Sequence, residues 1–165
     1  MIKVFLVDDH EVVRRGLSDL VGAQRDMEVV GEAGTARNAL GRIEATAPNV
    51  AVLDVRLPDG SGIDLCRDIR SQMPAVACLM LTAYDDDAAM NASVLAGAAG
   101  YVLKDINGSR LVGAVRAAAE GRSVVSPALA NRATESLRQR ADDDDPRMGR
   151  LVFASGRFSG SSLME

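Results

Sequence analysis

The sequence predicts an α/β protein with a doubly wound, five-stranded parallel sheet of order 2-1-3-4-5 and helices on both faces. Short Val- and Leu-rich runs alternate with longer segments whose apolar residues recur every three or four positions, which is typical of βα units. The 165 residues are enough for one domain with a substantial core. Aromatic residues make up only 3%, so aliphatic side chains must fill that core, as is usual in α/β proteins.

The strands are predicted first, because buried parallel strands form nearly continuous apolar runs bounded by polar or turn residues. Runs of this kind occupy residues 2–7, 28–33, 50–53, 77–81 and 100–103. The segments between and after them have the amphipathic period of helices, at residues 11–23, 35–47, 62–72, 86–96 and 109–120. Leu111, Val112 and Val115 form an apolar stripe on the last of these helices, and Gly121 follows at a C-cap position.

The remaining residues predict a connection and a tail. A further short helix is predicted at 126–140, where Pro127 follows a Ser cap. The acidic run "ADDDDP" after it repels itself and ends in proline, so it is interpreted as a solvated linker. We therefore expect a folded domain at 1–121, a connecting helix and linker at 122–146, and a disordered tail at 147–165 that is too short for a DNA-binding domain.

Composition and charge argue against several functions. The net charge of −4 provides no electrostatic footprint for nucleic acid. Cys66 and Cys78 lie in apolar segments without CxxC spacing, which favours reduced core thiols over a zinc site or a disulfide. The N-terminus lacks the pattern of a signal peptide and no apolar run reaches the roughly 20 residues of a membrane span, so we expect a cytoplasmic protein without membrane contact.

The residues at which the predicted strands stop are the candidate functional site. In an open parallel sheet, ligands bind at the carboxyl ends of the strands. Four of the five strands end there in a polar or charged side chain, namely Asp8 and Asp9, Asp54, Thr82 and Lys104. Each has an ordinary explanation alone, since an Asp pair can cap a helix, a Thr can simply end a strand and a Lys is usually solvated. Their joint placement at one edge favours a site.

Three carboxylates at one edge repel each other, and a divalent cation would relieve that repulsion. Ligands that are all oxygen suit Mg²⁺, whereas zinc and copper prefer His or Cys. A carboxylate beside Mg²⁺ and a lysine is a competent phosphoryl acceptor, because both cations neutralise the charge on the transferring group. The residues thus predict Asp54 as the nucleophile, with Thr82 and Lys104 as donors to the phosphoryl oxygens.

Four motifs are also those of a known family. "VDDH", "LDVRLPDGSGIDLCRDIR", "LTAYDDD" and "GYVLKDI" together make residues 1–121 resemble a bacterial response-regulator receiver domain. The resemblance implies that Asp54 is phosphorylated and that Tyr101 is a switch aromatic moving with Thr82. It further implies that Mg²⁺ is bound by Asp8, Asp9, Asp54 and the backbone carbonyl of Arg56.

Lys104 is followed by Asp105, which resembles the NarL/FixJ (LuxR-type) subfamily, and the N-terminal half looks closest to its dormancy and hypoxia regulators. This implies a sensor histidine kinase as the phosphodonor, a homodimer, and control of transcription by a protein that is not itself an enzyme. Members of this subfamily bind DNA through a C-terminal helix-turn-helix domain. The sequence predicts no such domain, so DNA binding by this chain is not expected.

Two other functions remain open at this point. The chain could be a stand-alone receiver that acts by protein contact or as a phosphate sink. A haloacid-dehalogenase-type phosphatase also uses an aspartyl nucleophile, but that class needs a second Asp two residues later, where Arg56 stands. No glycine-rich nucleotide loop follows any strand. His10 is interpreted as an exposed residue at the entrance of a helix rather than as a phosphoryl carrier.

Overall fold

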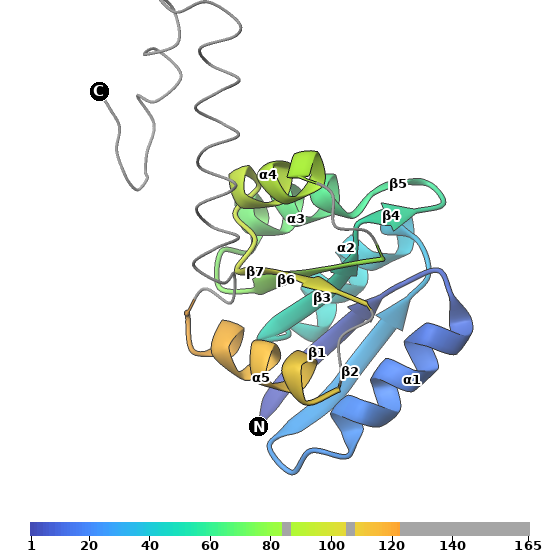
Figure 1. Ribbon diagram of the computed structural model, residues 1–165, viewed down its shortest axis with the longest axis vertical. Coiled ribbons are helices and arrows are strands. Elements are labelled where there is room, and N and C mark those ends of the chain that lie inside the picture. The colour runs from blue at the N-terminus through green and yellow to red at the C-terminus, as the bar shows by residue number, and fades with distance from the viewer. Residues whose placement is uncertain (84–86, 105–107, 123–165) are drawn as a thin grey trace, which may run out of the picture. The chain divides into compact units, whose positions relative to one another are not determined.

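The computed structural model describes residues 1–83, 87–104 and 108–122 (Figure 1). Its main sheet is parallel and has the order β2-β1-β3-β6-β7. The strands are β1 (Ile2–Val7), β2 (Met27–Ala33), β3 (Val50–Asp54), β6 (Ala77–Thr82) and β7 (Gly100–Leu103). This confirms the predicted order 2-1-3-4-5. The numbering differs because a small antiparallel hairpin, β4 (Arg56–Leu57) and β5 (Gly60–Ser61), intervenes and was not predicted.

Five helices of the described residues cover the two faces of this sheet. They are α1 (Glu11–Gly22), α2 (Ala36–Thr46), α3 (Gly62–Gln72), α4 (Asp87–Leu95) and α5 (Gly108–Ala119). Helices α1 and α5 contact each other, while α3 contacts both α2 and α4, which gives the two-sided arrangement that was predicted (Figure 1). None of these helices is long and apolar enough to cross a membrane. The predicted helix at 126–140, the acidic linker and the tail lie outside the described residues.

Capping residues explain the small differences between predicted and observed helix ends. Thr35 was predicted inside the second helix but is its N-cap, and its side chain accepts a hydrogen bond from the Asn38 amide at 3.2 Å. At the end of α5, Gly121 has a φ of +81°. The Gly121 amide donates to the carbonyl of Ala118 and the Arg122 amide to that of Ala117. This is the Schellman pattern, and it confirms the predicted C-cap glycine.

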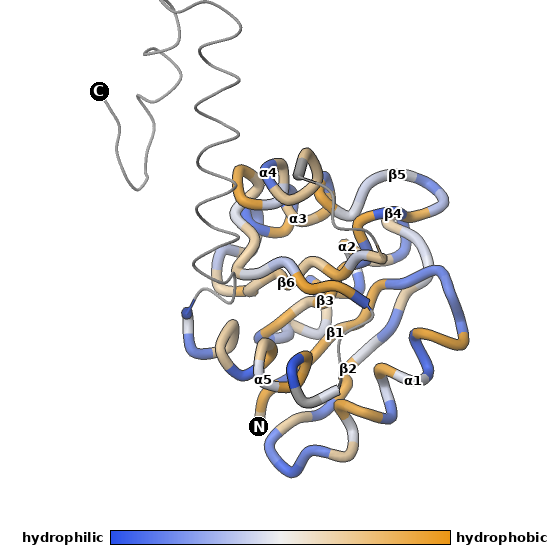
Figure 2. The backbone as a smooth tube through the Cα atoms, viewed as in Figure 1, coloured by the Kyte–Doolittle hydropathy of each residue, from blue (hydrophilic) through white to orange (hydrophobic). Residues whose placement is uncertain are grey.

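The core lies between the sheet and the helices. In Figure 2 the tube of the interior strand β1 is mainly orange, whereas α1 alternates between orange and blue, as expected for a helix with one face on the sheet. Every residue of β3 is buried. Leu111 and Val115 pack into the main cluster of buried residues beside strands β1, β3 and β6, so this stripe of α5 faces the core.

The two cysteines are free, buried thiols, as the sequence predicted. Cys66 lies on α3 and Cys78 on β6. The neighbouring Cys66 thiol and burial both raise the pKa of Cys78. Cys78 therefore stays protonated and behaves as a small apolar core residue.

The hairpin β4–β5 is tied to the start of α2 by one carboxylate. Asp59, at the tip of the hairpin, accepts hydrogen bonds from the backbone amides of Ala36 at 2.8 Å and Arg37 at 2.9 Å. These two hydrogen bonds lower the pKa of Asp59. The helix therefore receives its anionic cap from a residue more than twenty positions away, and the cap holds the loop that follows Asp54 in place.

Loss of this cap is expected to destabilise the domain. Asp59→Ala leaves two amides at the start of α2 without their acceptor, which should lower the urea concentration at the midpoint of unfolding. Urea unfolding followed by circular dichroism measures this midpoint. Asp68→Ala is the matched control, because Asp68 is exposed on α3, where alanine is a good helix former. Equal unfolding midpoints for the two variants would show that the Asp59 cap contributes nothing.

Candidate functional site

The register of the sheet brings the predicted site residues to one edge. Val7 pairs with Leu53, Asp54 with Leu81, and Thr82 with Leu103, so β1, β3, β6 and β7 end at the same level. Asp8 follows β1 directly, and its amide donates to the carbonyl of Ala33 on β2. The carboxylates of Asp8 and Asp54 and the hydroxyl of Thr82 are buried at this edge.

Lys104 connects the two buried carboxylates. Its ammonium Nζ lies 2.9 Å from Oδ2 of Asp54 and 3.1 Å from Oδ2 of Asp8. The Lys104 side chain is only 16% exposed, so water screens these ion pairs weakly. The Lys104 amide also donates to the carbonyl of Thr82 at 2.6 Å, which fixes the lysine beside the end of β6. The predicted meeting of Asp8, Asp54 and Lys104 is therefore present.

This arrangement changes the titration of both partners. Burial raises the pKa of Asp54, the Lys104 hydrogen bond lowers it, and the charge of Asp8 raises it again, with a net increase. Burial lowers the pKa of Lys104, but hydrogen bonds to Asp54 and Asp8 outweigh burial and leave it raised. At neutral pH Lys104 remains an ammonium, and Asp54 is a more basic carboxylate than an exposed aspartate, which favours it as a nucleophile.

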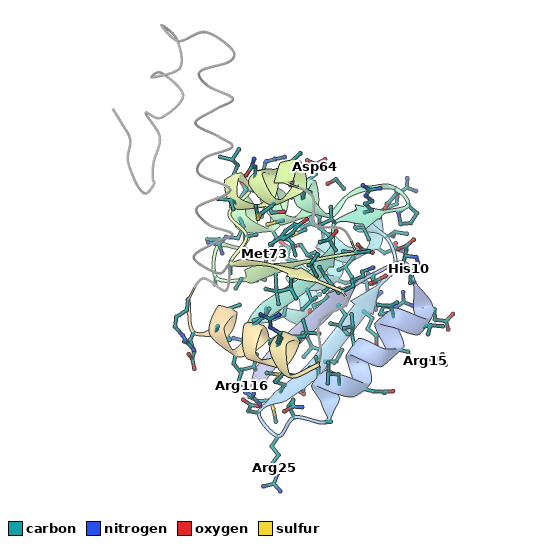
Figure 3. All side chains as sticks on the ribbon, in the orientation of Figure 1. His10, Arg15, Arg25, Asp64, Met73 and Arg116 are labelled. Atoms are coloured by element: carbon teal, nitrogen blue, oxygen red, sulfur yellow. The ribbon has the colours of Figure 1, made fainter. Side chains whose placement is uncertain are left out.

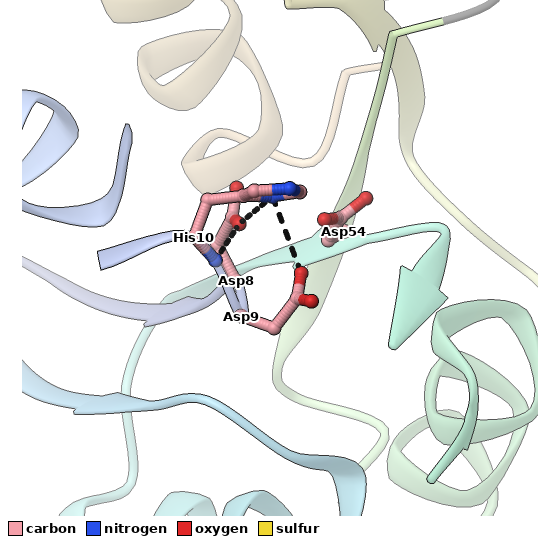
Figure 4. A group of neighbouring side chains, drawn as sticks. All are labelled: Asp8, Asp9, His10 and Asp54. Carbon is pink, nitrogen blue, oxygen red and sulfur yellow. Dashed lines mark hydrogen bonds and ion pairs between the residues drawn. The ribbon is translucent and has the colours of Figure 1, made fainter. Parts of the chain in front are cut away.

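Asp8, Asp9 and His10 follow β1 directly and together form the acidic end of the site (Figure 4). His10 Nδ1 lies 3.2 Å from Oδ1 of Asp8 and 3.3 Å from Oδ1 of Asp9. The His10 amide donates to the same Asp8 oxygen at 2.8 Å. His10 is the N-cap residue of α1 without a capping side chain, so the acidic pair does not cap that helix. The ring is exposed, as expected, but the sequence did not indicate that Nδ1 turns toward the carboxylates.

The donor set suits a hard divalent cation. Asp8, Asp9, His10 and Asp54 each offer an atom within 4.8 Å of the others. Oδ2 of Asp8 is buried, and its partner among the described residues is the Lys104 ammonium at 3.1 Å, which Asp54 shares. One ammonium does not neutralise three carboxylates, so a cation would relieve the remaining repulsion. The residues fit Mg²⁺.

A pocket of about 370 Å³ opens onto this site. Its walls come from the acidic end, the ends of β3, β6 and β7, and the loop after Asp54, through residues Asp9, His10, Asp54, Arg56, Leu57, Pro58, Thr82, Ala83 and Lys104. The Arg56 amide donates to Oδ1 of Asp54 at 3.3 Å. Pockets of this size can hold a small molecule. The buried carboxylate of Asp54 can therefore be reached from solvent.

Gly62 allows the loop after Asp54 to fold back closely. A Cβ atom at this position would lie 1.8 Å from the Asp54 carbonyl oxygen, which no side chain tolerates. The Gly62 amide donates to the carbonyl of Val55 at 2.8 Å. The loop can therefore turn back this closely only because residue 62 is glycine.

Tyr101, the predicted switch aromatic, does not line this pocket. It pairs with Met80 in the β6–β7 ladder and is 5% exposed. Thr82, two residues beyond Met80, lines the pocket. The two predicted switch residues therefore lie on adjacent strands and are both buried.

Comparisons with known proteins agree on one family. A model of the family described as response regulator receiver domain matches residues 4–116. The chain is 55% identical over 149 residues to the DNA-binding transcriptional activator DevR/DosR of Mycobacterium tuberculosis. This alignment covers 90% of this chain and 69% of that protein. It is 39% identical over 123 residues to the uncharacterized transcriptional regulatory protein YxjL of Bacillus subtilis, covering 74% of this chain and 56% of that protein.

A solved structure supports the same likeness. The signal receiver domain of the response regulator NarL from Mycobacterium tuberculosis, described as putative, superposes with a TM-score of 0.71 at 35% identity. The match covers 73% of this chain and 98% of that domain. Fold, motifs and relatives therefore indicate the same family.

Proposed function

The chain belongs to the response regulator receiver family, and from this premise we propose that Asp54 accepts a phosphoryl group from a sensor histidine kinase in a Mg²⁺-dependent reaction. The chain is a receiver of two-component signalling, related to DevR/DosR. The observation that carries the proposal is the position of Asp54, which is paired with Lys104 at 2.9 Å and opens into the pocket. We further propose that Asp8, Asp9, Asp54 and the backbone carbonyl of Arg56 hold the cation.

The side chains divide the chemistry among them. An Asp54 carboxylate oxygen attacks phosphorus and forms the new O–P bond, while the bond to the leaving group breaks and its electron pair departs with that group. Lys104 neutralises the charge on the phosphoryl oxygens, and the Thr82 hydroxyl donates to one of them. Mg²⁺, when bound, supplies further charge neutralisation and orients the phosphoryl group.

We also propose that the phosphoryl group shifts a conformational equilibrium. Phosphorylation adds negative charge at Asp54 and new acceptors for Thr82 and Lys104. Thr82 then moves toward the phosphoryl group, and Tyr101 on the neighbouring strand follows into the space that Thr82 leaves. A shift from 1:99 to 99:1 would need about 5.5 kcal/mol, so a partial shift is expected.

The wider role follows from the relatives. DevR/DosR is described as a DNA-binding transcriptional activator. By this likeness we propose that the chain serves transcription control as a homodimer, with DNA contact assigned to an output domain rather than to the receiver at 1–121. We propose a cytoplasmic phosphoprotein that signals and does not act as an enzyme on other substrates. A stand-alone receiver acting by protein contact is the alternative with the same site.

Acetyl phosphate tests the proposed reaction. Incubation of the chain with this small phosphodonor and Mg²⁺ is expected to add one phosphoryl group, seen in the intact mass. The adduct should be removed by hydroxylamine because it is an acyl phosphate. With EDTA in place of Mg²⁺, labelling should fall to background because the three carboxylates then repel the donor. Labelling that is unaffected by EDTA or stable to hydroxylamine would contradict the proposal.

A further inference from the structure

We propose that Arg14, held in place by Glu32, is a positioning residue of the phosphorylation site, where it orients the peptide group between Asp8 and Asp9 and so directs the Asp9 carboxylate toward the pocket. The inference rests on the proposed function, because it concerns how the proposed cation site is prepared. Neither Arg14 nor Glu32 lines the pocket, and neither was among the residues predicted from the sequence.

The guanidinium of Arg14 connects α1 to the ends of two strands. Its Nη1 donates to the carbonyl oxygen of Asp8 at 2.5 Å, and its Nε donates to Oε1 of Glu32 on β2 at 3.1 Å. The Arg14 side chain is only 22% exposed, so water screens these interactions less than it would at an open surface. A charged donor makes a stronger hydrogen bond than a neutral one, and the planar fork of arginine serves two acceptors at once.

The carbonyl that Arg14 binds lies where the β1–β2 ladder stops. The Asp8 amide still donates to the carbonyl of Ala33 at 3.1 Å, but the paired residues of the two strands end at Val7 and Ala33. Arg14 therefore gives the Asp8 carbonyl the donor that a further residue of β2 would otherwise supply. The guanidinium passes close to Gly34, where a Cβ atom would lie 3.4 Å from Nη1.

This hydrogen bond fixes the direction in which the chain leaves β1. A peptide group is planar, so holding the Asp8 carbonyl oxygen also sets the position of the Asp9 nitrogen and Cα. The Asp8 carboxylate is buried and held by Lys104 at 3.1 Å. Asp9 lines the pocket, and its ion pair among the described residues is with the exposed His10 ring. The placement of the Asp9 carboxylate therefore depends on the backbone that Arg14 holds.

Three possible roles of Arg14 predict different changes in Mg²⁺ affinity when its side chain is removed. A positioning role predicts weaker binding, because hydrogen bonds behind the ligands typically contribute roughly 10- to 100-fold to metal affinity. A purely electrostatic role predicts tighter binding, because a positive charge that repels Mg²⁺ is lost. A purely structural role predicts lower stability, with an unchanged Mg²⁺ affinity of the folded protein.

Isothermal titration calorimetry of the full chain with Mg²⁺, without any phosphodonor, tests the inference. Arg14→Met is expected to bind Mg²⁺ on the order of tenfold more weakly than the wild type. Arg14→Lys keeps the charge but has a single nitrogen in place of the fork, so its affinity should lie between those of Arg14→Met and the wild type. Glu32→Gln removes the ionic anchor of Arg14 and should weaken Mg²⁺ binding less than Arg14→Met does.

Arg15→Met is the matched control. Arg15 follows Arg14 on α1 but points away from the sheet (Figure 3), is 75% exposed and pairs with Glu11 at 3.1 Å. Its charge is screened by solvent, so the Mg²⁺ affinity of this control should stay within about twofold of the wild type. Wild-type or tighter Mg²⁺ binding by Arg14→Met would overturn the inference. If Arg14→Met does not fold, wild-type affinities of both Arg14→Lys and Glu32→Gln would overturn it equally.

Labelling by acetyl phosphate separates this inference from the proposed function. Arg14→Met should need on the order of tenfold more Mg²⁺ for the half-maximal rate. Its rate at saturating Mg²⁺ should stay within about threefold of the wild type, because Asp54 and Lys104 are unchanged. Labelling of the wild type together with equal Mg²⁺ affinities of the wild type and Arg14→Met would leave the proposed function standing and overturn the inference. Weaker Mg²⁺ binding by Arg14→Met with no labelling of the wild type would support the inference and overturn the proposed reaction.

Discussion

Asp54→Asn is expected to reduce phosphoryl labelling by acetyl phosphate from one group per chain to background. The amide has nearly the same shape as the carboxylate, but it is not a competent nucleophile toward phosphorus. The effect should be complete because Asp8 does not line the pocket, and Asp9, which does, pairs with His10 rather than with Lys104. Intact mass after a fixed incubation measures the labelled fraction.

Asp64→Asn is the matched control for this variant. Asp64 is an exposed carboxylate in the first turn of α3, and within the described part of the chain it pairs with Arg67 on the same helix at 2.8 Å. The control should label like the wild type. If Asp54→Asn retains labelling comparable to the control, the assignment of the acceptor is wrong.

Lys104→Met has the second large expected effect, a loss of folding free energy in the absence of metal. Lys104 is the ammonium that pairs with both Asp8 and Asp54, whose side chains are 1% and 6% exposed. Removing one member of a buried ionic cluster leaves the remaining charges uncompensated, so we expect a loss on the order of 3 kcal/mol in EDTA. Thermal and urea unfolding measure this loss.

Added Mg²⁺ should recover much of the stability of this variant, because binding to the folded state alone stabilises it by mass action. Lys3→Met is the control, since Lys3 is the other lysine of the sequence and is exposed on β1. A Lys104→Met variant that is as stable in EDTA as Lys3→Met would contradict the proposed charge balance. Equal stabilisation by Mg²⁺ of both variants would contradict the placement of the cation beside Asp8 and Asp54.

The pH dependence of stability tests whether burial of Asp54 outweighs its pairing with Lys104. The pKa of Asp54 is raised in the folded protein above its ordinary value. Its ionised form therefore costs folding free energy above the folded-state pKa, and this cost disappears as the pH falls below the unfolded-state pKa. In EDTA at neutral pH, Asp54→Asn should then unfold at a higher temperature than the wild type, with a difference that shrinks on acidification. A lower melting temperature for the variant at neutral pH would show that pairing with Lys104 outweighs burial.

The sheet could be predicted from the sequence because its strands are continuous apolar runs that end in polar residues. Strands 2–7 and 100–103 were predicted with their observed bounds, and β3 and β6 each extend one residue further, to Asp54 and Thr82. Asp54 and Thr82 are the polar residues at strand ends from which the site was predicted. The same boundary therefore revealed both the strand and the functional residue, because a parallel sheet places its ligands where its strands stop.

Other parts of the site depend on contacts that a linear pattern does not contain. The β4–β5 hairpin has two-residue strands, too short for any period. The Asp59 cap joins residues that are distant in sequence. The double ion pair of Lys104 depends on how far its side chain reaches across β3 toward Asp8, and the direction of the His10 ring depends on a rotamer. These features follow from tertiary packing, not from local propensity.

Borohydride reduction of the labelled wild-type chain, followed by peptide mass spectrometry, tests the central claim most directly. Borohydride converts an aspartyl phosphate to homoserine, which marks the residue that carried the phosphoryl group. We predict homoserine at position 54 and unchanged aspartate at positions 8, 9 and 59. Homoserine at any of those other aspartates, or a phosphoryl group on His10, would contradict the account of Asp54 as the acceptor.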